Sequence, residues 1–530
     1  MKNRELNRKT IIIILAIIII LQTVCYAVLA TQKAYLHVDE GYSYGLINYD
    51  KLNIADNGNF YDNWHDGEYY KDYLTISSEE KNYWLPVYEN QKNDVHPPFY
   101  YFLLRIADSF SIDNFSMWPG IILNIIIHIG ITIFTYLIAS KIFKNKISGL
   151  IIAFAGGLTV SALETVMLAR MYALTALNIL IITYLHMINF EKYNINARML
   201  ALMGVCIVIG SLTHYYYLVF VFVIYAIFMI KYLLDRNYKM AGKYTLTMGI
   251  SAIVSLLIFP YSFNHIFMGY RGQGILSNLS DIQKAGENFG GYLGLVVRDT
   301  FNYIGAVIII VFAIIILTKI LITRKEITFK IKNEQIILAV IPTLVYFLVI
   351  AMGSPYIEIR YIMPICPLIF ILGIYAFKII LEKVLNAKQI GITISIMLVV
   401  MLITPIIEKQ PISYTYTEKK NIVEWIEQNH SVPTIYISKK EHNRIMDDVY
   451  LFSKIDKSYV LYSENASDEN LKIALENQDI ENGLIVFINE YVDNNEYLDK
   501  LKAVTGLNSC TWIERMNACD IYYLTQENSN

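Results

Sequence analysis

Two acidic residues directly follow the first long apolar run of this 530-residue sequence and are the first candidates for chemistry. Asp39 and Glu40 lie in the segment His-Val-Asp-Glu-Gly-Tyr-Ser, nine residues beyond the end of that run at Ala30. A carboxylate in this position can take a proton from an acceptor hydroxyl or amine, as a general base must. A solvated loop is the alternative interpretation of two adjacent acids. The aromatic, glycine-containing setting close to an apolar run favours the catalytic hypothesis.

His96 belongs to a second motif, Asn-Asp-Val-His-Pro-Pro-Phe-Tyr-Tyr, at residues 93–101. Two consecutive prolines suit the first turn of a helix, where a missing N–H group costs nothing. The motif therefore predicts an amphipathic helix over 99–110 that lies in the membrane interface. His96 would stand at the N-terminus of this helix, where the partial positive charge favours a phosphate. The alternative is a histidine that only caps an anchor helix.

Further basic and aromatic residues are predicted near the ends of apolar runs on the same, external side of the membrane. They are Arg170 with Tyr172, His214 in the segment Thr-His-Tyr-Tyr-Tyr, Arg271, and Arg360 close to Glu358. Ionisable groups at membrane depth are costly and usually functional, although a lone arginine at a helix end often only extends its charge to the interface. A carboxylate together with arginine and histidine is the charge pattern that a lipid-phosphate leaving group requires.

The composition indicates that these residues belong to a membrane protein. Hydrophobic residues make up 55% of the chain and charged residues 17%, with a mean hydropathy of +0.40. Runs long enough to cross a bilayer core of about 30 Å predict eleven helical spans. They cover residues 10–30, 117–140, 147–165, 171–190, 198–212, 215–234, 243–262, 302–322, 335–352, 361–380 and 389–407. A single helix over 198–234 would be about 55 Å long at 1.5 Å per residue, so a break near 210–214 is expected.

The basic residues fix the predicted orientation. With eleven spans, the clusters at 2–9, 141–146, 192–198, 231–243, 319–332 and 378–388 all fall on one side. Short loops rich in Lys and Arg mark the cytoplasmic side, so the N-terminus is predicted inside and the C-terminus outside. The apolar run at 11–30 is longer than the core of a signal peptide, about 7–15 residues, which indicates an uncleaved first span. The expected location is therefore a multi-pass plasma-membrane protein, with a bacterial origin indicated by the Ile, Lys, Asn and Tyr bias.

Three external pieces follow from this topology. The transmembrane domain is expected over 1–407 with external loops at 31–116 and 263–301, and a soluble domain over 408–530. In the latter, alternating runs predict a small α/β fold: helices over 419–428 and 440–452, and strands over 434–437, 483–488, 509–515 and 520–525. Cys510 and Cys519 flank the last hairpin, where a disulfide is allowed outside the cell and two free thiols are equally compatible with the sequence.

The ordered set of motifs resembles the bacterial GT-C glycosyltransferases, and within them the protein-mannosyltransferase-like group (glycosyltransferase family 39, RgtA/B/C/D-like). The resemblance covers roughly residues 10–407. The motifs that carry it are the Asp-Glu after the first span, Asp-x-His-Pro-Pro-x-Tyr-Tyr, Ala-Arg-x-Tyr-x-Leu, Thr-His-Tyr-Tyr and Arg-Tyr-x-x-Pro. It implies a GT-C fold and transfer, with inversion, from a polyprenyl-phosphate sugar to an envelope glycan, lipid or protein. It also implies Asp39 as base or acceptor binder beside Glu40, His96 and Arg170 near the active cavity, and Arg360 on the donor phosphate.

Other functions remain open from the residues alone. Intramembrane charges also mark the ion paths of secondary transporters, and lipid-linked saccharide flippases and polysaccharide polymerases share many spans with external arginines. No basic stripe of the kind that binds nucleic acid is visible, and no cluster of metal ligands stands out, so neither a nucleic-acid partner nor a cofactor is expected. The sugar and the acceptor are not specified by these motifs.

Overall fold

A computed structural model describes residues 6–56, 58–269, 273–274, 277–278, 281–323 and 334–527. The chain divides into two compact units. The first comprises Met1–Thr31, Val95–Tyr100 and Ile121–Ile412, and the second comprises Gln32–Asp94, Tyr101–Gly120 and Ser413–Asn530. Each unit is built from segments that are distant in sequence.

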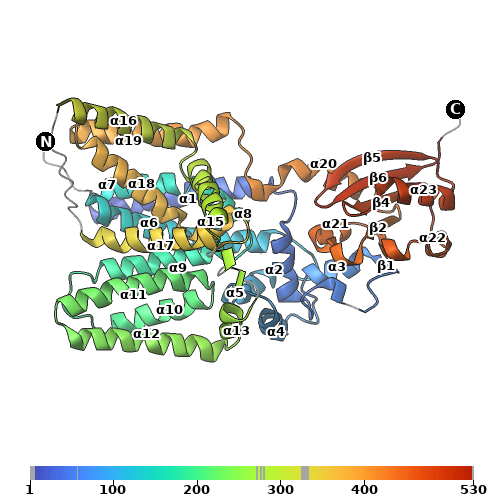
Figure 1. Cartoon of the computed structure of the whole chain (residues 1–530), viewed down its shortest axis with the longest axis horizontal. Coiled ribbons are helices and arrows are strands. Elements are labelled where there is room, and N and C mark those ends of the chain that lie inside the picture. Colours follow the sequence, from blue (N-terminus) through green and yellow to red (C-terminus); the bar gives the residue numbers. More distant parts are fainter. Residues whose placement is uncertain are drawn as a thin grey trace. The chain divides into compact units, whose positions relative to one another are not determined.

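The first unit is an assembly of long apolar helices (Figure 1). Each of the eleven predicted spans coincides with a helix or a bent pair of helices, which confirms a polytopic α-helical membrane protein. The helices are α1 (Arg8–Ala30), α6 (Trp118–Phe143), α7 (Lys146–Gly156), α8 (Val160–Met167), α9 (Tyr172–Met187), α10 (Ala197–Ser211), α11 (Tyr216–Leu234), α12 (Tyr238–Ile258), α16 (Ile304–Thr323), α17 (Ile337–Gly353), α18 (Cys366–Leu381) and α19 (Ala387–Ile407). Within the described part, seven are long and apolar enough to span a bilayer, or nine if each bent pair counts as one span.

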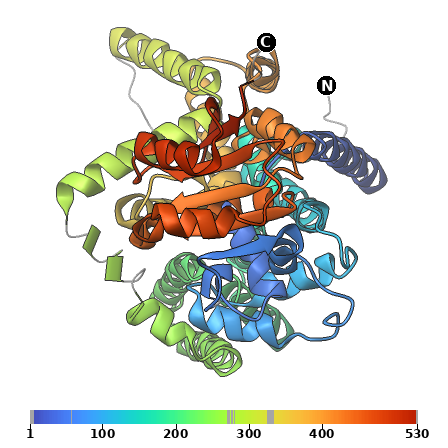
Figure 2. The same ribbon diagram turned by 90° about the vertical axis from the view of Figure 1, so that its right-hand side faces the viewer.

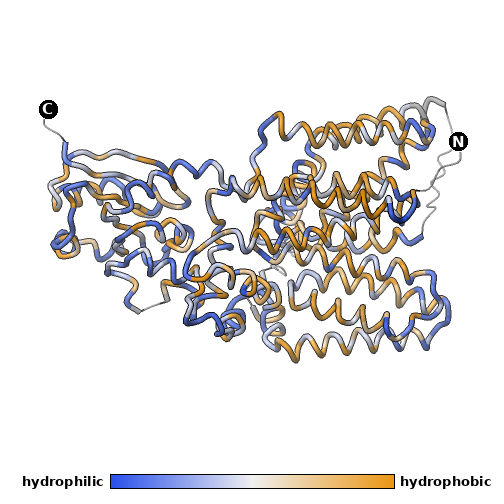
Figure 3. The backbone as a smooth tube through the Cα atoms, turned by 180° about the vertical axis from the view of Figure 1, so that it is seen from behind, coloured by the Kyte–Doolittle hydropathy of each residue, from blue (hydrophilic) through white to orange (hydrophobic). Residues whose placement is uncertain are grey.

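Hydrophobic side chains cover the outer surfaces of these helices, as a lipid environment requires. Large apolar residues such as Ile13, Ile20 and Leu257 are more than half exposed. Figure 3 shows the helices of this unit as largely hydrophobic along their length, with hydrophilic residues gathered near their ends. The predicted break between residues 210 and 214 is confirmed, because α10 ends at Ser211 and α11 begins at Tyr216.

Two bent pairs interrupt the regular helices. Helices α7 and α8 meet at 57° across a short break at Gly157–Thr159, where the Thr159 hydroxyl accepts from the N–H of Ala162 and caps α8. The segment of α15 (Ile282–Leu295) and the π-helical turn η2 (Val296–Thr300) meets α16 at 104°. A broken helix leaves backbone polar groups unpaired, so its ends require polar side chains.

The second unit contains a six-stranded sheet with the strand order β1-β3-β2-β4-β6-β5 (Figure 2). Strands β2 (Thr434–Ser438), β3 (Lys457–Tyr462) and β4 (Leu484–Asn489) are mutually parallel, with Ile435 opposite Tyr459 on one side and Val486 on the other. Strands β5 (Ser509–Met516) and β6 (Cys519–Thr525) form the predicted hairpin, and β6 pairs antiparallel with β4. The predicted α/β class is confirmed. Cys510 and Cys519 are both free thiols; Cys510 lies opposite Leu524 and Cys519 opposite Met516.

The core of the second unit lies between the sheet and two helices. Apolar residues of β2, β3 and β4 pack against α22 (Asp468–Leu475) and α23 (Asn494–Thr505), with Leu471 and Leu501 fully buried. Strand β1 (Asn63–Asp66) comes from the first predicted loop and pairs antiparallel with β3. The folded unit therefore combines the sequence-predicted tail with α2 (Val38–Asn48), α3 (Gly67–Leu74), α4 (Leu85–Asn93) and most of α5 (Phe99–Asp108).

Candidate active site

Asp39 lies in the first turn of helix α2, within the segment 31–116 that the sequence predicts to connect the first two spans. The helix begins with a capping box. The Nδ1 atom of His37 accepts from the N–H of Asp39 at 3.0 Å, and the Glu40 carboxylate accepts from the N–H of His37 at 2.9 Å. Free N–H groups and the helix dipole at this end favour negatively charged side chains. The fold therefore places both acids in the first turn of α2.

The surroundings of the two acids differ. The Asp39 side chain is 26% exposed, whereas the side chains of Glu40 and its partner Lys33 are each 1% exposed. The ammonium of Lys33 donates to both carboxylate oxygens of Glu40, at 3.0 and 2.8 Å. A buried charge must be paired in this way, since an unpaired one is very costly. Asp39 is thus the acid that a reactant can reach, and Glu40 anchors the helix that carries it.

Residues that begin the C-terminal segment hold the chain that leads into α2. The Lys33 ammonium also donates to the carbonyl of Tyr414 at 2.8 Å, and the Ala34 N–H donates to the carbonyl of Thr415 at 2.8 Å. The ring of His37 packs edge-on against the ring of Tyr414, with centroids 5.6 Å apart. The position of Asp39 therefore depends on residues almost 400 positions away in sequence.

The buried carboxyl group of Asp448 is hydrogen-bonded to Tyr35, in the segment that leads into α2. Asp448 is fully buried in η9 (Ile445–Asp448), and its Oδ1 accepts from the Tyr35 hydroxyl at 3.1 Å and from the Asn517 amide. Burial, reinforced by the neighbouring charge of Asp447, raises the pKa of Asp448 to about 7. The ammonium of Lys419 lies 4.7 Å from the centre of the Tyr35 ring, in cation–π geometry. Sequence reasoning did not identify these groups, because nothing in the local pattern links Tyr35 to residues 447–517.

The first unit brings four of the predicted site residues together: His96, Arg170, Tyr172 and His214. The guanidinium Nη2 of Arg170 lies 3.4 Å from Nε2 of His96. The ring of His214 has its centroid 6.2 Å from that of His96 and 5.6 Å from that of Tyr172. Arg170, Tyr172 and His214 are buried, and His96 is partly exposed. This Arg–His cluster provides positive charge and aromatic surface at one place.

Breaks between helices position this cluster. His96 precedes α5, and the backbone N–H of Phe99 donates to the carbonyl of Leu212 in the turn between α10 and α11, which also carries His214. Arg170 lies in the turn between α8 and α9, where the Asn124 amide donates to the carbonyl of Leu168 at 2.7 Å. Three motifs that are separate in sequence therefore meet because the turns that carry them are hydrogen-bonded to neighbouring segments.

Arg360 joins the cluster through aromatic rings. Its guanidinium carbon lies 5.3 Å from the centre of the Tyr361 ring, and that ring lies 6.5 Å from the ring of Tyr172 and 6.4 Å from that of Tyr216. The hydroxyl of Tyr346 donates to the carbonyl of Tyr361 at 3.1 Å. The predicted residue Arg271 lies outside the described residues. The sequence did not predict that these tyrosines pack against one another between Arg360 and Tyr172.

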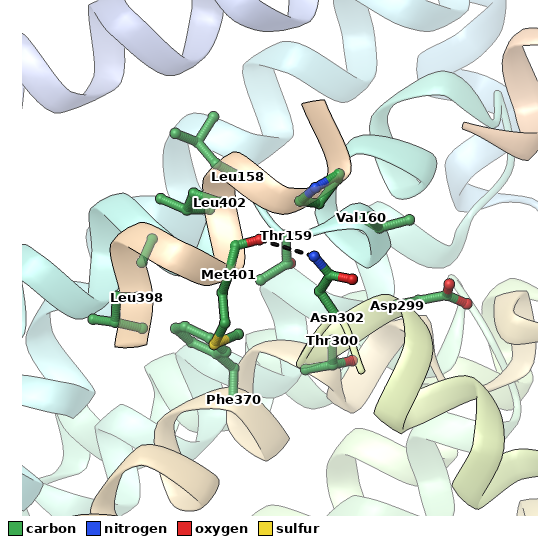
Figure 4. Close-up of a pocket in the computed structure, with 12 residues that line it drawn as sticks. Leu158, Thr159, Val160, Asp299, Thr300, Asn302, Phe370, Leu398, Met401 and Leu402 are labelled. Atoms are coloured by element: carbon green, nitrogen blue, oxygen red, sulfur yellow. Dashed lines mark hydrogen bonds between the residues drawn. The ribbon is translucent and has the colours of Figure 1, made fainter. Parts of the chain in front are cut away.

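A small cavity and a buried ion pair lie beside the bent helix pairs in the first unit. Arg298 donates to both oxygens of the buried Asp299 carboxylate, at 2.6 and 2.8 Å. A small cavity beside it, lined by Thr159, Asp299, Thr300 and Asn302 among others, offers about 10 Å³ for the centre of a water molecule (Figure 4). The Asn302 amide crosses this cavity and donates to the carbonyl of Met401 (Figure 4). This region fits a water rather than a substrate.

Metal-ligand geometry is lacking in the part of the chain that the structure describes. No group of three or more His, Cys, Asp and Glu side chains there is arranged to hold a metal ion. Each unit has its own group of candidate residues: an accessible carboxylate at a helix N-terminus in the second unit, and an Arg–His–Tyr cluster in the first.

Comparison with known proteins finds similarity to solved structures but not to protein families or curated sequences. No protein-family model matches the chain, and no curated protein matches it in sequence. Among solved structures, ArnT from Cupriavidus metallidurans bound to undecaprenyl phosphate is similar at 11% identity and a TM-score of 0.46, covering 97% of this chain and 98% of that one. AglB, an archaeal oligosaccharyltransferase from Archaeoglobus fulgidus solved with an inhibitory peptide and a dolichol-phosphate, is similar at 9% identity and a TM-score of 0.41, covering 97% and 74%. At these values GT-C membership stays a resemblance.

Proposed function

We propose that this chain is a membrane glycosyltransferase that moves a sugar from a polyprenyl-phosphate carrier to a cell-envelope acceptor. The observation that carries the proposal is the convergence of His96, Arg170, Tyr172 and His214, with Arg360 joined through Tyr361. Arginine presents a planar fork that matches a phosphate, and histidine adds a second donor. A cluster of this kind within an apolar helical unit suits a phosphate attached to a lipid chain.

The proposed reaction assigns separate roles to the two sets of residues. An acceptor hydroxyl or amine attacks the anomeric carbon of the sugar, and its proton passes to the carboxylate of Asp39. The bond between the anomeric carbon and the phosphate oxygen breaks, and the polyprenyl phosphate leaves with the bonding electron pair. Arg170, His96 and Arg360 stabilise the negative charge that gathers on this phosphate. Attack from the face opposite the leaving group inverts the anomeric configuration.

Glu40 has a supporting role in this proposal. Its carboxylate is occupied by Lys33 and by the N–H of His37, so it fixes the start of α2 and leaves the proton transfer to Asp39. The outward orientation of the catalytic side rests on the distribution of basic residues, which favours a cytoplasmic N-terminus and an external C-terminal segment.

One observation favours a second candidate function, secondary transport. Two helix pairs are broken, and each carries a buried acid in one of its two elements, Glu164 in α8 and Asp299 in η2. Discontinuous helices with interior acids form the ion and substrate sites of many transporters. Sealed vesicles that contain the purified chain separate the two functions. A transporter moves a radiolabelled solute along an ion gradient, whereas a transferase leaves solute distribution unchanged.

Identification of the bound lipid tests the proposed function directly. The chain is purified in a mild detergent, and the co-extracted lipids are analysed by mass spectrometry. We expect a polyprenyl phosphate or its sugar ester to copurify with the wild-type chain and to be depleted in Arg170→Ala. Lys383→Ala, which changes a basic residue beyond the end of α18, is the matched control. Equal recovery of polyprenyl phosphate from the Arg170 variant, or its absence from all samples, would refute the donor assignment.

A further inference from the structure

A polar cavity of about 410 Å³ opens in the second unit at the C-terminal end of α2. Its lining includes Asn48, Asp50, Lys51, Asp72, Thr75 and Glu80, and it contains none of the residues assigned to the reaction above. Nearly all of the lining groups are hydrogen-bonding or charged. A cavity of this size and polarity suits a small hydrophilic group rather than a lipid or an apolar ligand.

A buried arginine organises the floor of this cavity. The guanidinium of Arg105, 1% exposed, donates to the Ile47 carbonyl at 2.8 Å, to Oδ1 of Asn48 at 2.7 Å and to the carbonyl of Glu80 at 2.8 Å. The Asn48 amide then donates to the carboxyl group of Asp108 at 2.8 Å. These bonds tie the end of α2 to the turn that carries Glu80. The cavity is therefore held in shape by its own hydrogen-bond network before any ligand enters.

The charges around the cavity favour a cation. Asp50, Asp72 and Glu80 contribute three carboxylates, and Lys51 is the single basic residue in the lining. Lys71 is a cation whose charge acts on Asp72, and its ammonium is paired with Glu68. Burial and the nearby acids Glu68, Asp66 and Glu80 raise the pKa of Asp72. The carbonyl groups at the C-terminus of α2 add further negative potential.

A buried hydroxyl in the wall points independently to a ligand with hydrogen-bonding groups. Thr75 is 6% exposed, and its Oγ1 has no hydrogen-bond partner in the part of the chain that the structure describes. Such a group is costly to leave unpaired inside a protein. A hydroxyl can donate or accept, so a ligand hydroxyl is a suitable partner for Thr75, while an ammonium suits the carboxylates.

We propose that this cavity is a binding subsite for a hydroxyl-rich group that carries a protonated amine, such as an amino sugar of the acceptor. The term acceptor rests on the proposed transferase function. From Asp39 to Asn48, α2 rises by about 14 Å at 1.5 Å per residue. The subsite therefore binds a part of the acceptor remote from the atom that receives the sugar. Binding energy at such a distance selects the acceptor without altering the reacting groups.

Calorimetric titration of the full-length chain in detergent tests this subsite without requiring catalysis. The probes are a trimer of glucosamine, below the pKa of its amines, and the same trimer fully N-acetylated. We expect the glucosamine trimer to bind and the acetylated trimer to bind at least about 10-fold more weakly. Asp72→Asn and Asp50→Asn should each weaken glucosamine binding by about 5- to 10-fold, and Thr75→Val should weaken it with folding retained. Glu89→Gln, an acid of the same unit outside the cavity, is the control.

Three results would overturn the subsite. They are equal affinity for the two trimers, unchanged affinity in both aspartate variants, and calcium binding with no affinity for either sugar. Failure of the transferase proposal is distinguishable, because it would abolish sugar transfer from a prenyl-phosphate donor while the glucosamine trimer still bound with the same dependence on Asp72.

Discussion

At the scale of single residues, the proposed reaction assigns different roles to two neighbouring acids. Glu40 is 1% exposed and paired with Lys33, and Asp39 is accessible at the start of α2. If Asp39 is the base, its amide is a near-isosteric replacement that cannot accept the proton. We expect Asp39→Asn to fold normally and to lose transfer by about 100-fold or more, the scale of general-base catalysis.

The measurement is kcat with a prenyl-phosphate sugar donor, alongside a thermal unfolding curve for each variant. Glu79→Gln, an exposed acid of the same unit, is the control and should retain full activity. Near-normal turnover of Asp39→Asn would show that Asp39 is not the general base.

Arg360 provides a second test at this scale. A charge-assisted hydrogen bond contributes about 1.5–3 kcal/mol, so Arg360→Ala should lose roughly 10- to 150-fold in kcat/KM. Because lysine offers a point charge and not a planar fork, Arg360→Lys should recover only part of the loss. Arg360 also stacks near Tyr361, so the alanine variant is checked for stability. Full activity of the lysine variant, with only a stability defect in the alanine variant, would reject contact with the phosphate.

At the scale of elements, the start of α2 depends on a turn of the C-terminal segment that contains a buried carboxyl group. Burial raises the pKa of Asp448 from an ordinary carboxyl value to about 7, so the folded state binds a proton that the unfolded state lacks between about pH 4 and pH 7. Stability therefore falls as the pH rises through this window, by on the order of a few kcal/mol, since each pKa unit corresponds to about 1.4 kcal/mol.

Asp448→Asn should remove most of this pH dependence. The replacement keeps an oxygen that accepts from Tyr35 and Asn517, and it carries no charge that must be buried. We expect the Tm of the variant to change less than that of the wild type between pH 5 and pH 8, and to be higher at pH 8. Asp499→Asn, an exposed acid on α23, should leave the pH profile unchanged. If the Tm of Asp448→Asn changes with pH as much as that of the wild type, another group causes the pH dependence.

Hydropathy predicted the helices that the bilayer stabilises, but the sequence analysis missed several elements of the second unit, namely β1, β3, α22 and α23. All eleven apolar runs became helices, because a bilayer leaves helices as the way to satisfy the backbone. Strand β1 was missed because Asn-Trp-His-Asp has no alternating apolar pattern and is a strand only through its pairing with β3. The predicted helix at 440–452 was wrong in extent. It consists of two 3₁₀ turns and the four-residue α21 (Val449–Phe452), with Asp448 turned into the core.

The candidate site residues also divide into those that sequence motifs contain and those that only long-range contacts reveal. The motifs identified Arg170, Tyr172, His96 and His214, whose convergence follows from the alternation of spans that the sequence reveals. Lys33, Tyr414 and Asp448 were not identified, because their role arises from contacts between residues that are 381 and 413 positions apart in sequence.

At the scale of the whole molecule, the orientation in the membrane is the claim on which an external reaction depends. A cysteine introduced at the exposed residue Gln526, in a Cys510→Ser background, should react with a membrane-impermeant thiol reagent on intact cells. A cysteine at Lys239, in the basic region predicted inside, should react only after lysis. The reverse pattern would invert the topology.

Sugar transfer from a defined donor shows whether this chain is a glycosyltransferase that uses polyprenyl-phosphate sugars. The purified chain is incubated with a synthetic polyprenyl-phosphate sugar and an envelope extract, and the anomeric configuration of the product is determined by NMR spectroscopy. We expect a product linked with inverted configuration, formed by the wild type and by Glu79→Gln but at least about 100-fold more slowly by Asp39→Asn. Release of no sugar from any prenyl-phosphate donor, or a product with retained configuration, would contradict it.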